Sequence, residues 1–255
     1  MTVAAATDLY QRGIATLLAS WEEYAGGSAG AAVARLDGVA VGVFPAEPER
    51  SVYNNAVLDR DLGAAGHAAA IDAMEATYDA AGVERYAAWV HESDEPMRAE
   101  LTGRGYRLDE ITRAMGMPLA ARGRETGAAG IGPGSWDDHV AYLGRDGAPA
   151  GVLSRADPAA FRVLVARLGG EIAGTAMAFD HAGDCGVFNV GTLAPYRRRG
   201  IGTALVNRLL RDAFSRGNHT ATLQSTEIAA GVYAAAGFRD LGRIFEYVPA
   251  GAPPG

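Results

Sequence analysis

The sequence predicts an α+β fold made of two similar domains. Its last 120 or so positions read in order as a strand, a basic glycine-containing loop, a helix, a second strand and a short helix, and part of this order recurs in the first 120. The chain has 255 residues, which suits two domains that each form a core of their own. We therefore predict domains at residues 1–120 and 136–255, with a Gly- and Ala-rich linker at 121–135.

The composition indicates a soluble enzyme. Hydrophobic residues make up 49% of the chain and charged residues 21%, as in globular proteins. The net charge of −7 argues against a nucleic-acid surface. Apolar runs of membrane-spanning length and the pattern of a signal peptide are both missing, so we expect a cytoplasmic protein without membrane or nucleic-acid partners. A single cysteine, Cys185, excludes an internal disulfide.

The loop after the strand predicted at 186–193 is the most informative segment. It contains Arg197-x-x-Gly200-x-Gly202, and a helix begins there. Glycines let backbone N–H groups point into one concavity, and a helix N-terminus adds unpaired donors and the positive end of a dipole. The loop is therefore predicted to bind a phosphate or pyrophosphate. The residues expected to contact this anion are Arg197, Arg198, Arg199, Gly200, Ile201, Gly202 and Thr203.

Two common phosphate loops do not fit this segment. A P-loop requires Gly-Lys-Ser/Thr, and the chain contains no lysine. A dinucleotide fingerprint requires a third glycine three residues after Gly202, where the sequence has Leu205.

The residues after the loop extend the pattern. From 200 to 216, apolar residues recur every four positions, and Val206, Leu210 and Phe214 widen the stripe, which predicts an amphipathic helix. Residues 219–225 alternate as a strand does, and 227–236 form a short helix that ends in Tyr233-x-x-x-Gly237-Phe238.

The loop and this ending together resemble the GNAT acetyltransferase superfamily, whose signatures are Gln/Arg-x-x-Gly-x-Gly/Ala and Tyr-x-x-x-Gly-Phe. The resemblance implies a mostly antiparallel mixed sheet flanked by helices, with acetyl-CoA as acyl donor and no metal. It implies that the strand before the loop is bulged and splays from the next strand, so that its backbone pairs with pantetheine. It also implies that Tyr233 protonates the departing thiolate, and that a backbone N–H at Thr192 or Leu193 faces the thioester oxygen.

Three sequence blocks of the second half have counterparts in the first half, at offsets of 132 to 135 residues, which predicts a duplicated domain. The first copy is degenerate, because Leu101 stands at the position of the tyrosine, and Asp59 and Asp61 flank the arginine of a shorter loop. Two carboxylates oppose a pyrophosphate, so we expect donor binding in the second half only. We expect the first half to shape the acceptor cleft.

The general base stays open at this stage. The strand before the loop offers Asp184, Cys185 and Asn189 but no glutamate. His181 in the preceding turn could accept a proton or be merely solvated, and Cys185 could form a thioester or simply pack. Asn54 and Asn55 could polarise an acceptor or be structural. The remaining histidines have no metal-ligand spacing: His67, His91, His139 and His219.

The predicted function is acetyl transfer from acetyl-CoA to a primary amine of a small molecule, by direct attack in a ternary complex. Two alternatives stay open: a non-catalytic protein that senses acyl-CoA, and an acetyltransferase of a peptide or protein amine. The chain is expected to be a monomer, which the duplication would make a pseudo-dimer, or a homodimer.

Overall fold

The computed structural model describes residues 3–46, 53–121, 130–147 and 151–251. Their contacts divide the chain into two compact units. Unit 1 consists of Met1–Ser20 and Ala114–Leu241, and unit 2 consists of Trp21–Arg113 and Gly242–Gly255. Helix α1 (Val3–Gly26) and strands β5 (Tyr106–Pro118) and β11 (Arg239–Pro249) have residues in both units.

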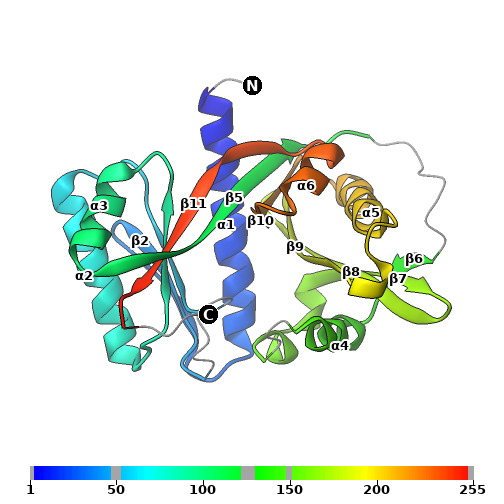
Figure 1. Cartoon of the computed structure of the whole chain (residues 1–255), viewed down its shortest axis with the longest axis horizontal. Helices are drawn as coiled ribbons and strands as arrows, with labels where there is room; N and C mark the ends of the chain where they lie inside the picture. The colour runs from blue at the N-terminus through cyan, green and yellow to red at the C-terminus, as the bar shows by residue number, and fades with distance from the viewer. Residues whose placement is uncertain (1–2, 47–52, 122–129, 148–150, 252–255) are drawn as a thin grey trace. The chain divides into compact units, whose positions relative to one another are not determined.

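Figure 1 labels most of the other elements. Unit 2 contains β1 (Ala32–Leu36), β2 (Val39–Val43), β3 (Asn55–Leu58), α2 (Ala64–Ala81), β4 (Ala87–His91) and α3 (Glu95–Gly103). Unit 1 contains β6 (Ile131–Pro133), α4 (Trp136–Asp146), β7 (Phe161–Leu168), β8 (Glu171–His181), β9 (Asp184–Thr192), α5 (Ile201–Ser215), β10 (Thr220–Thr226), α6 (Ala230–Ala236) and three short 3₁₀ helices at Leu153–Arg155, Pro158–Ala160 and Ala194–Tyr196.

The two units repeat one order of elements. In unit 2, β1 pairs antiparallel with β2, β2 antiparallel with β3, and β3 parallel with β4. In unit 1, β7, β8, β9 and β10 pair in the same three ways. In both, a helix joins the parallel strands, and a shorter helix follows them. The predicted α+β fold, a mixed and mostly antiparallel sheet flanked by helices, is confirmed.

The last strand of each half lies in the sheet of the other half. Strand β11 pairs antiparallel with β4, from Ile244 opposite His91 to Tyr247 opposite Ala88. Strand β5 is the neighbour of β10. The units therefore differ in membership from the predicted domains 1–120 and 136–255, because each contains a strand from the far part of the chain.

The predicted linker at 121–135 divides into two parts. Residues 122–129 lie outside the described residues. The end of the segment belongs to unit 1, where β6 pairs antiparallel with β7, and the Ser135 side chain caps α4 by accepting a hydrogen bond from the Asp138 N–H. An edge strand needs backbone partners rather than an apolar period, so the sequence pattern did not indicate it.

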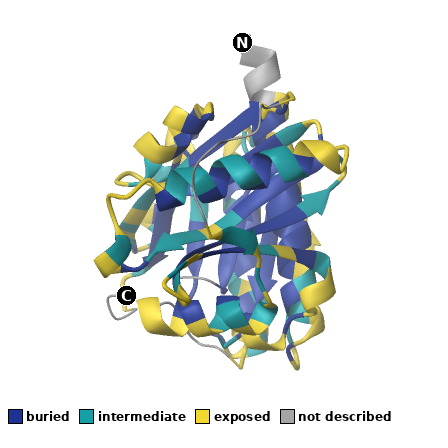
Figure 2. Ribbon diagram, turned by 90° about the vertical axis from the view of Figure 1, so that its right-hand side faces the viewer, coloured by how far each residue is buried: buried dark blue, intermediate teal, exposed yellow. Residues whose placement is uncertain are grey.

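The core of unit 1 lies between α5 and the sheet. Helix α5 buries Ile201, Leu205 and Leu209 against small residues of β8 such as Ala176. Phe214, predicted to widen this stripe, is instead 40% exposed, one residue before the helix ends at Ser215. In Figure 2 the strands are mostly buried, and exposed residues gather at turns and on outer helix faces.

Helix α1 is joined to this unit through a buried carboxylate. The side chain of Asp184, at the start of β9, accepts hydrogen bonds from the hydroxyls of Thr16 (2.8 Å), Thr220 (2.6 Å) and Thr222 (2.6 Å). Gly13 lets α1 approach β10, because a Cβ there would lie 3.1 Å from the Thr222 Cβ. The carboxylate thus connects α1, β9 and β10. Asp184 was a candidate general base in the sequence, and the structure gives it a structural role instead.

We expect Asp184→Asn to lower the free energy of unfolding by about 2–4 kcal/mol, because an amide receives three hydroxyl donors poorly and hydrogen bonds to charged groups are among the stronger ones. Urea denaturation measures this loss. The control is Asp180→Asn, which removes a carboxylate that is partly exposed and paired with Arg216 at 2.6 Å. That change should cost about 1 kcal/mol or less. Equal losses would contradict the role assigned to Asp184.

Candidate functional site

Strand β9 separates from β10 along its second part. Their paired residues run from Thr220 opposite Asp184 to Thr222 opposite Gly186. Beyond Gly186, β9 continues to Thr192, and β10 continues to Thr226. Peptide groups of β9 in this region therefore face an opening rather than a neighbouring strand.

A bulge in β9 lies inside this opening. Thr175 of β8 is opposite Gly191 and Met177 is opposite Phe188, so β9 has one residue more than β8 between these pairs. Asn189, within the extra stretch, adopts a φ of +48°, which asparagine tolerates better than most residues. A bulge bends a strand and changes the direction of its peptide groups.

The loop after β9 turns through two left-handed residues, Arg198 (φ +65°) and Gly200 (φ +74°). Gly200 is the N-cap of α5, and no side chain caps that helix end. The first N–H groups of a helix have no partners within it, so this end of α5 offers donors and a partial positive charge.

The three loop arginines differ in their contacts. Arg197 donates from Nε to the Thr192 carbonyl at 2.9 Å, and its Nη2 lies 3.5 Å from the Asp146 carboxylate. Arg199 donates to the Pro195 carbonyl at 3.3 Å and lies over the Tyr196 ring. Arg198 is exposed and has no hydrogen-bond partner in the part of the chain that the structure describes.

Tyr233 lies on α6, which ends at Gly237 in the left-handed conformation (φ +102°). Its side chain is 8% exposed and its ring contacts Phe238 edge to face, with centroids 6.0 Å apart. Burial raises the pKa of the Tyr233 phenol to about 12. The hydroxyl is therefore protonated throughout the neutral range.

One cavity of about 630 Å³ joins the end of β9, the loop, the start of α5 and α6. Eight of the ten residues predicted for the site line it: Thr192, Arg197, Arg198, Gly200, Ile201, Gly202, Thr203 and Tyr233. Arg199 and Leu193 are not among the lining residues.

The Leu193 N–H is already used, because it donates to the Ala173 carbonyl at 2.9 Å. The N–H groups of Thr192 and Leu193 were the two predicted donors to the thioester oxygen, and this bond excludes that of Leu193. Successive N–H groups of a strand point to opposite sides, so the N–H of Thr192 points away from β8 and toward the opening.

The other chemical candidates are structural. Cys185 is fully buried, and burial raises the pKa of its thiol well above the usual range, so the covalent route is not supported. His181 stacks on Phe179 with ring centroids 6.5 Å apart. Asn54 accepts the Phe44 N–H at 2.7 Å, and Asn55 is 1% exposed in unit 2. Across the described ranges, no three His, Cys, Asp or Glu side chains are grouped to hold a metal ion.

A row of polar side chains on α4 was not predicted. His139, Tyr142 and Asp146 follow at spacings of three and four, which places them on one helix face. His139 is fully buried, and its Nδ1 lies 2.9 Å from the Thr175 hydroxyl, which donates to the Leu164 carbonyl. Nδ1 is therefore the donor, and burial lowers the pKa of His139 to about 4, so Nε2 is an unprotonated acceptor.

Tyr142 is the middle member of this row and is 1% exposed. Its hydroxyl packs against Gly191, where an added Cβ would clash with it. Burial raises the pKa of the Tyr142 phenol, and the charge of Asp146 raises it further. A neutral phenol thus lies behind the bulged strand, and Asp146 lies at the end of the row, in the cavity.

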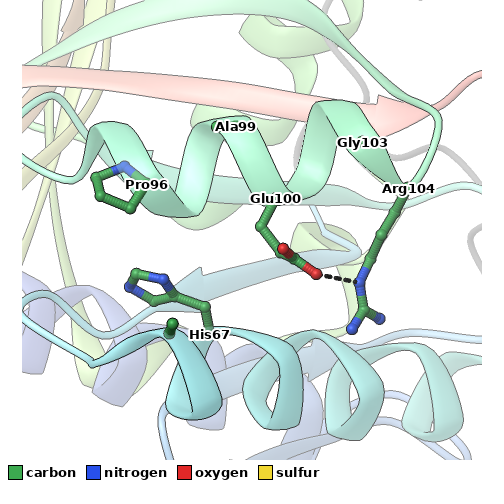
Figure 3. Close-up of a pocket in the computed structure, with 7 residues that line it drawn as sticks. His67, Pro96, Ala99, Glu100, Gly103 and Arg104 are labelled. Carbon is green, nitrogen blue, oxygen red and sulfur yellow. Dashed lines mark hydrogen bonds and ion pairs between the residues drawn. The ribbon is translucent and has the colours of Figure 1, made fainter.

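The corresponding place in unit 2 has a different lining. A cavity of about 560 Å³ lies between α2 and α3, and its walls carry His67, Glu100 and Arg104 (Figure 3). Arg104 is bound by the carboxylates of Glu100, Glu75 and Asp72, so its charge is compensated. The parallel pairing of β3 with β4 extends to Val57, one residue before β3 ends, so no comparable opening forms there.

None of the described helices is both long and apolar enough to cross a membrane.

Comparisons with known proteins show what this chain is similar to. Residues 132–238 match the model of the acetyltransferase (GNAT) family. A comparison with curated proteins finds no match.

Solved structures similar to this chain share its fold. A GCN5-related N-acetyltransferase from Kribbella flavida is 17% identical, with a TM-score of 0.71 over 92% of this chain and 95% of its own. One from Sphaerobacter thermophilus is also 17% identical, with a TM-score of 0.58 over 83% and 80%. A functionally unknown conserved protein from Staphylococcus epidermidis is 13% identical, with a TM-score of 0.59 over 84% and 91%. At these identities the likeness shows the fold alone. Residues 132–238 of this chain are therefore similar to the acetyltransferase (GNAT) family.

Proposed function

We propose that this protein transfers an acetyl group from acetyl-CoA to a primary amine of a small molecule. The observation that carries the proposal is the single cavity that joins an unpaired length of β9, a basic helix N-terminus and the buried phenol of Tyr233. The first feature suits pantetheine amides, the second a pyrophosphate and the third a leaving thiolate.

In the proposed reaction, a neutral amine attacks the thioester carbonyl carbon, and a carbon–nitrogen bond forms. The carbonyl oxygen becomes an anion, which the N–H of Thr192 stabilises. The carbonyl then re-forms as the carbon–sulfur bond breaks, the CoA thiolate takes the proton of Tyr233, and the amine nitrogen releases one proton to solvent. Tyr233 regains its proton from solvent.

The proposal includes a duplication. The repeated order of strand pairings and helices supports two copies of one domain, of which only the second retains the donor site. Arg104 in the pocket near α2 and α3 supports this difference, because carboxylates already compensate its charge. Asp59 also supports it, since burial and the nearby charge of Asp37 raise the pKa of its carboxyl. Cytoplasmic localisation, a monomeric or dimeric state and the absence of nucleic-acid and membrane partners remain predictions.

We expect calorimetry to give one acetyl-CoA site per chain, abolished by Gly200→Glu. That substitution puts a negative charge at the N-terminus of α5 and a side chain at a φ of +74°, where L-residues are strained. The matched control is Gly63→Glu at the N-cap of α2, where φ is −75° and a Cβ meets open space. The control should bind as the wild type does. Two equivalent sites, or equal losses in both variants, would refute the proposal.

Two alternatives have different outcomes. A sensor of acyl-CoA would bind acetyl-CoA at this site and release no CoA with any amine. An enzyme that acts on proteins would acetylate a peptide amine and leave small amines unchanged. The intact tyrosine beside the donor loop favours the enzyme over the sensor, because a sensor has no need of a proton donor at the thioester.

A further inference from the structure

Asp146 is the only carboxylate among the described residues that line the donor cavity. It is the last residue of α4, and its side chain is 31% exposed. The phenol of Tyr142, one turn earlier, is neutral and buried, and His139 beyond it is neutral as well. Asp146 is therefore the only negative charge that this row of α4 brings to the cavity.

Its contact with Arg197 is loose. The distance of 3.5 Å from Nη2 to the carboxylate exceeds that of a strong charge-assisted hydrogen bond, and both side chains are partly exposed. Arg197 is held separately, since its Nε donates to the Thr192 carbonyl at 2.9 Å. The guanidinium can thus change its outer partner while it remains attached to the end of β9.

We infer that Asp146 binds a positively charged group of the acceptor, and that Arg197 leaves this carboxylate for the donor's pyrophosphate. This inference rests on the proposed function. A pyrophosphate carries more charge and more acceptor oxygens than one carboxylate, so Arg197 gains by the exchange. Asp146 then has no cationic partner in a cavity that the donor has partly dehydrated, and an ammonium group of the acceptor compensates its charge.

The exchange predicts coupling between the two ligands. A donor that removes Arg197 from Asp146 strengthens the binding of a cationic acceptor. By linkage, the acceptor strengthens donor binding by the same factor. The substrate class is then an amine that carries a second cationic group.

The experiment titrates two probes into the full-length protein saturated with CoA, so that no turnover occurs. The probes are 1,4-diaminobutane and 4-amino-1-butanol, which match in length and differ in one ammonium group. We expect the diamine to bind about 10-fold more tightly, as one partly buried charge pair implies. Asp146→Asn should abolish this preference, and omission of CoA should reduce it.

The matched control is Glu171→Gln. Glu171 faces Arg145, the neighbour of Asp146, at 3.8 Å, and it does not line the cavity. This variant removes one negative charge from the same region and should keep the preference. Equal affinities of the two probes for the wild type, or a preference that survives in Asp146→Asn, would overturn the inference. If CoA still binds in that experiment, the proposed donor site is unaffected. Failure of CoA itself to bind would overturn both the proposed function and the inference.

Discussion

Tyr233→Phe is expected to lower kcat by about 10- to 1,000-fold, the range for loss of one general acid or somewhat less. In the proposed reaction the hydroxyl acts on the thiolate as it departs, so its loss should affect the transition state more than the bound donor. The dissociation constant of CoA should therefore stay within about three-fold of the wild-type value. Steady-state kinetics with thiol detection and calorimetry with CoA measure the two quantities separately.

Tyr196→Phe is the control, since Tyr196 lines the same cavity from the loop. It should leave kcat nearly unchanged. The pH profile gives a second check, because a phenol with a pKa of about 12 remains protonated, and able to donate, at every pH well below that value. The interval from pH 8 to pH 10 lies about 2 units or more below this pKa. A fall in rate within that interval would therefore have to come from another group. An unchanged kcat in Tyr233→Phe would return this residue to packing against Phe238.

A fragment that begins at Gly134 is expected to be insoluble or to self-associate. It lacks the part of α1 that supplies Thr16 to Asp184, and it lacks β5, the neighbour of β10. Met115 and Met117 of β5 belong to the buried core of unit 1, so their removal exposes apolar surface beside an unpaired strand edge. Size-exclusion chromatography and circular dichroism report the outcome.

A fragment from Ala114 separates the two causes. It restores Ala114–Pro118 of β5 and the edge strand β6, but not α1, so the edge of β10 is covered while Asp184 still lacks one donor. We expect it to be more soluble than the shorter fragment and less stable than the full chain. A monomeric, folded fragment from Gly134 would show that unit 1 does not depend on these elements.

Most of the residues that line the cavity could be predicted from the sequence, because their signals are local. The left-handed turn at Gly200, the helix that follows and the tyrosine before Gly237 all lie within about 40 consecutive positions. Such short-range patterns reflect backbone sterics and helix periodicity, which a single chain reveals.

The rest depended on contacts between distant residues. Thr16 and Asp184 are 168 positions apart, and neither residue type indicates which residue it will bind. The local sequence of β5 and β11 can indicate a strand and its buried residues, but it does not indicate which strands lie beside it. The spacing of Tyr142 and Asp146 is that of any amphipathic helix. Only the position of α4 beside the bulge makes these residues candidates for the site.

The placement of β11 also governs when the protein can finish folding on the ribosome. Strand β4 ends at His91, and its partner residues begin to be made only near Gly242. At about 5–20 residues per second, synthesis of the intervening chain takes on the order of 10–30 seconds. Throughout that time the edge of β4 is open to pairing with other nascent chains. A slow codon run or a pause late in translation would lengthen this exposure, whereas truncation after Leu241 would make it permanent.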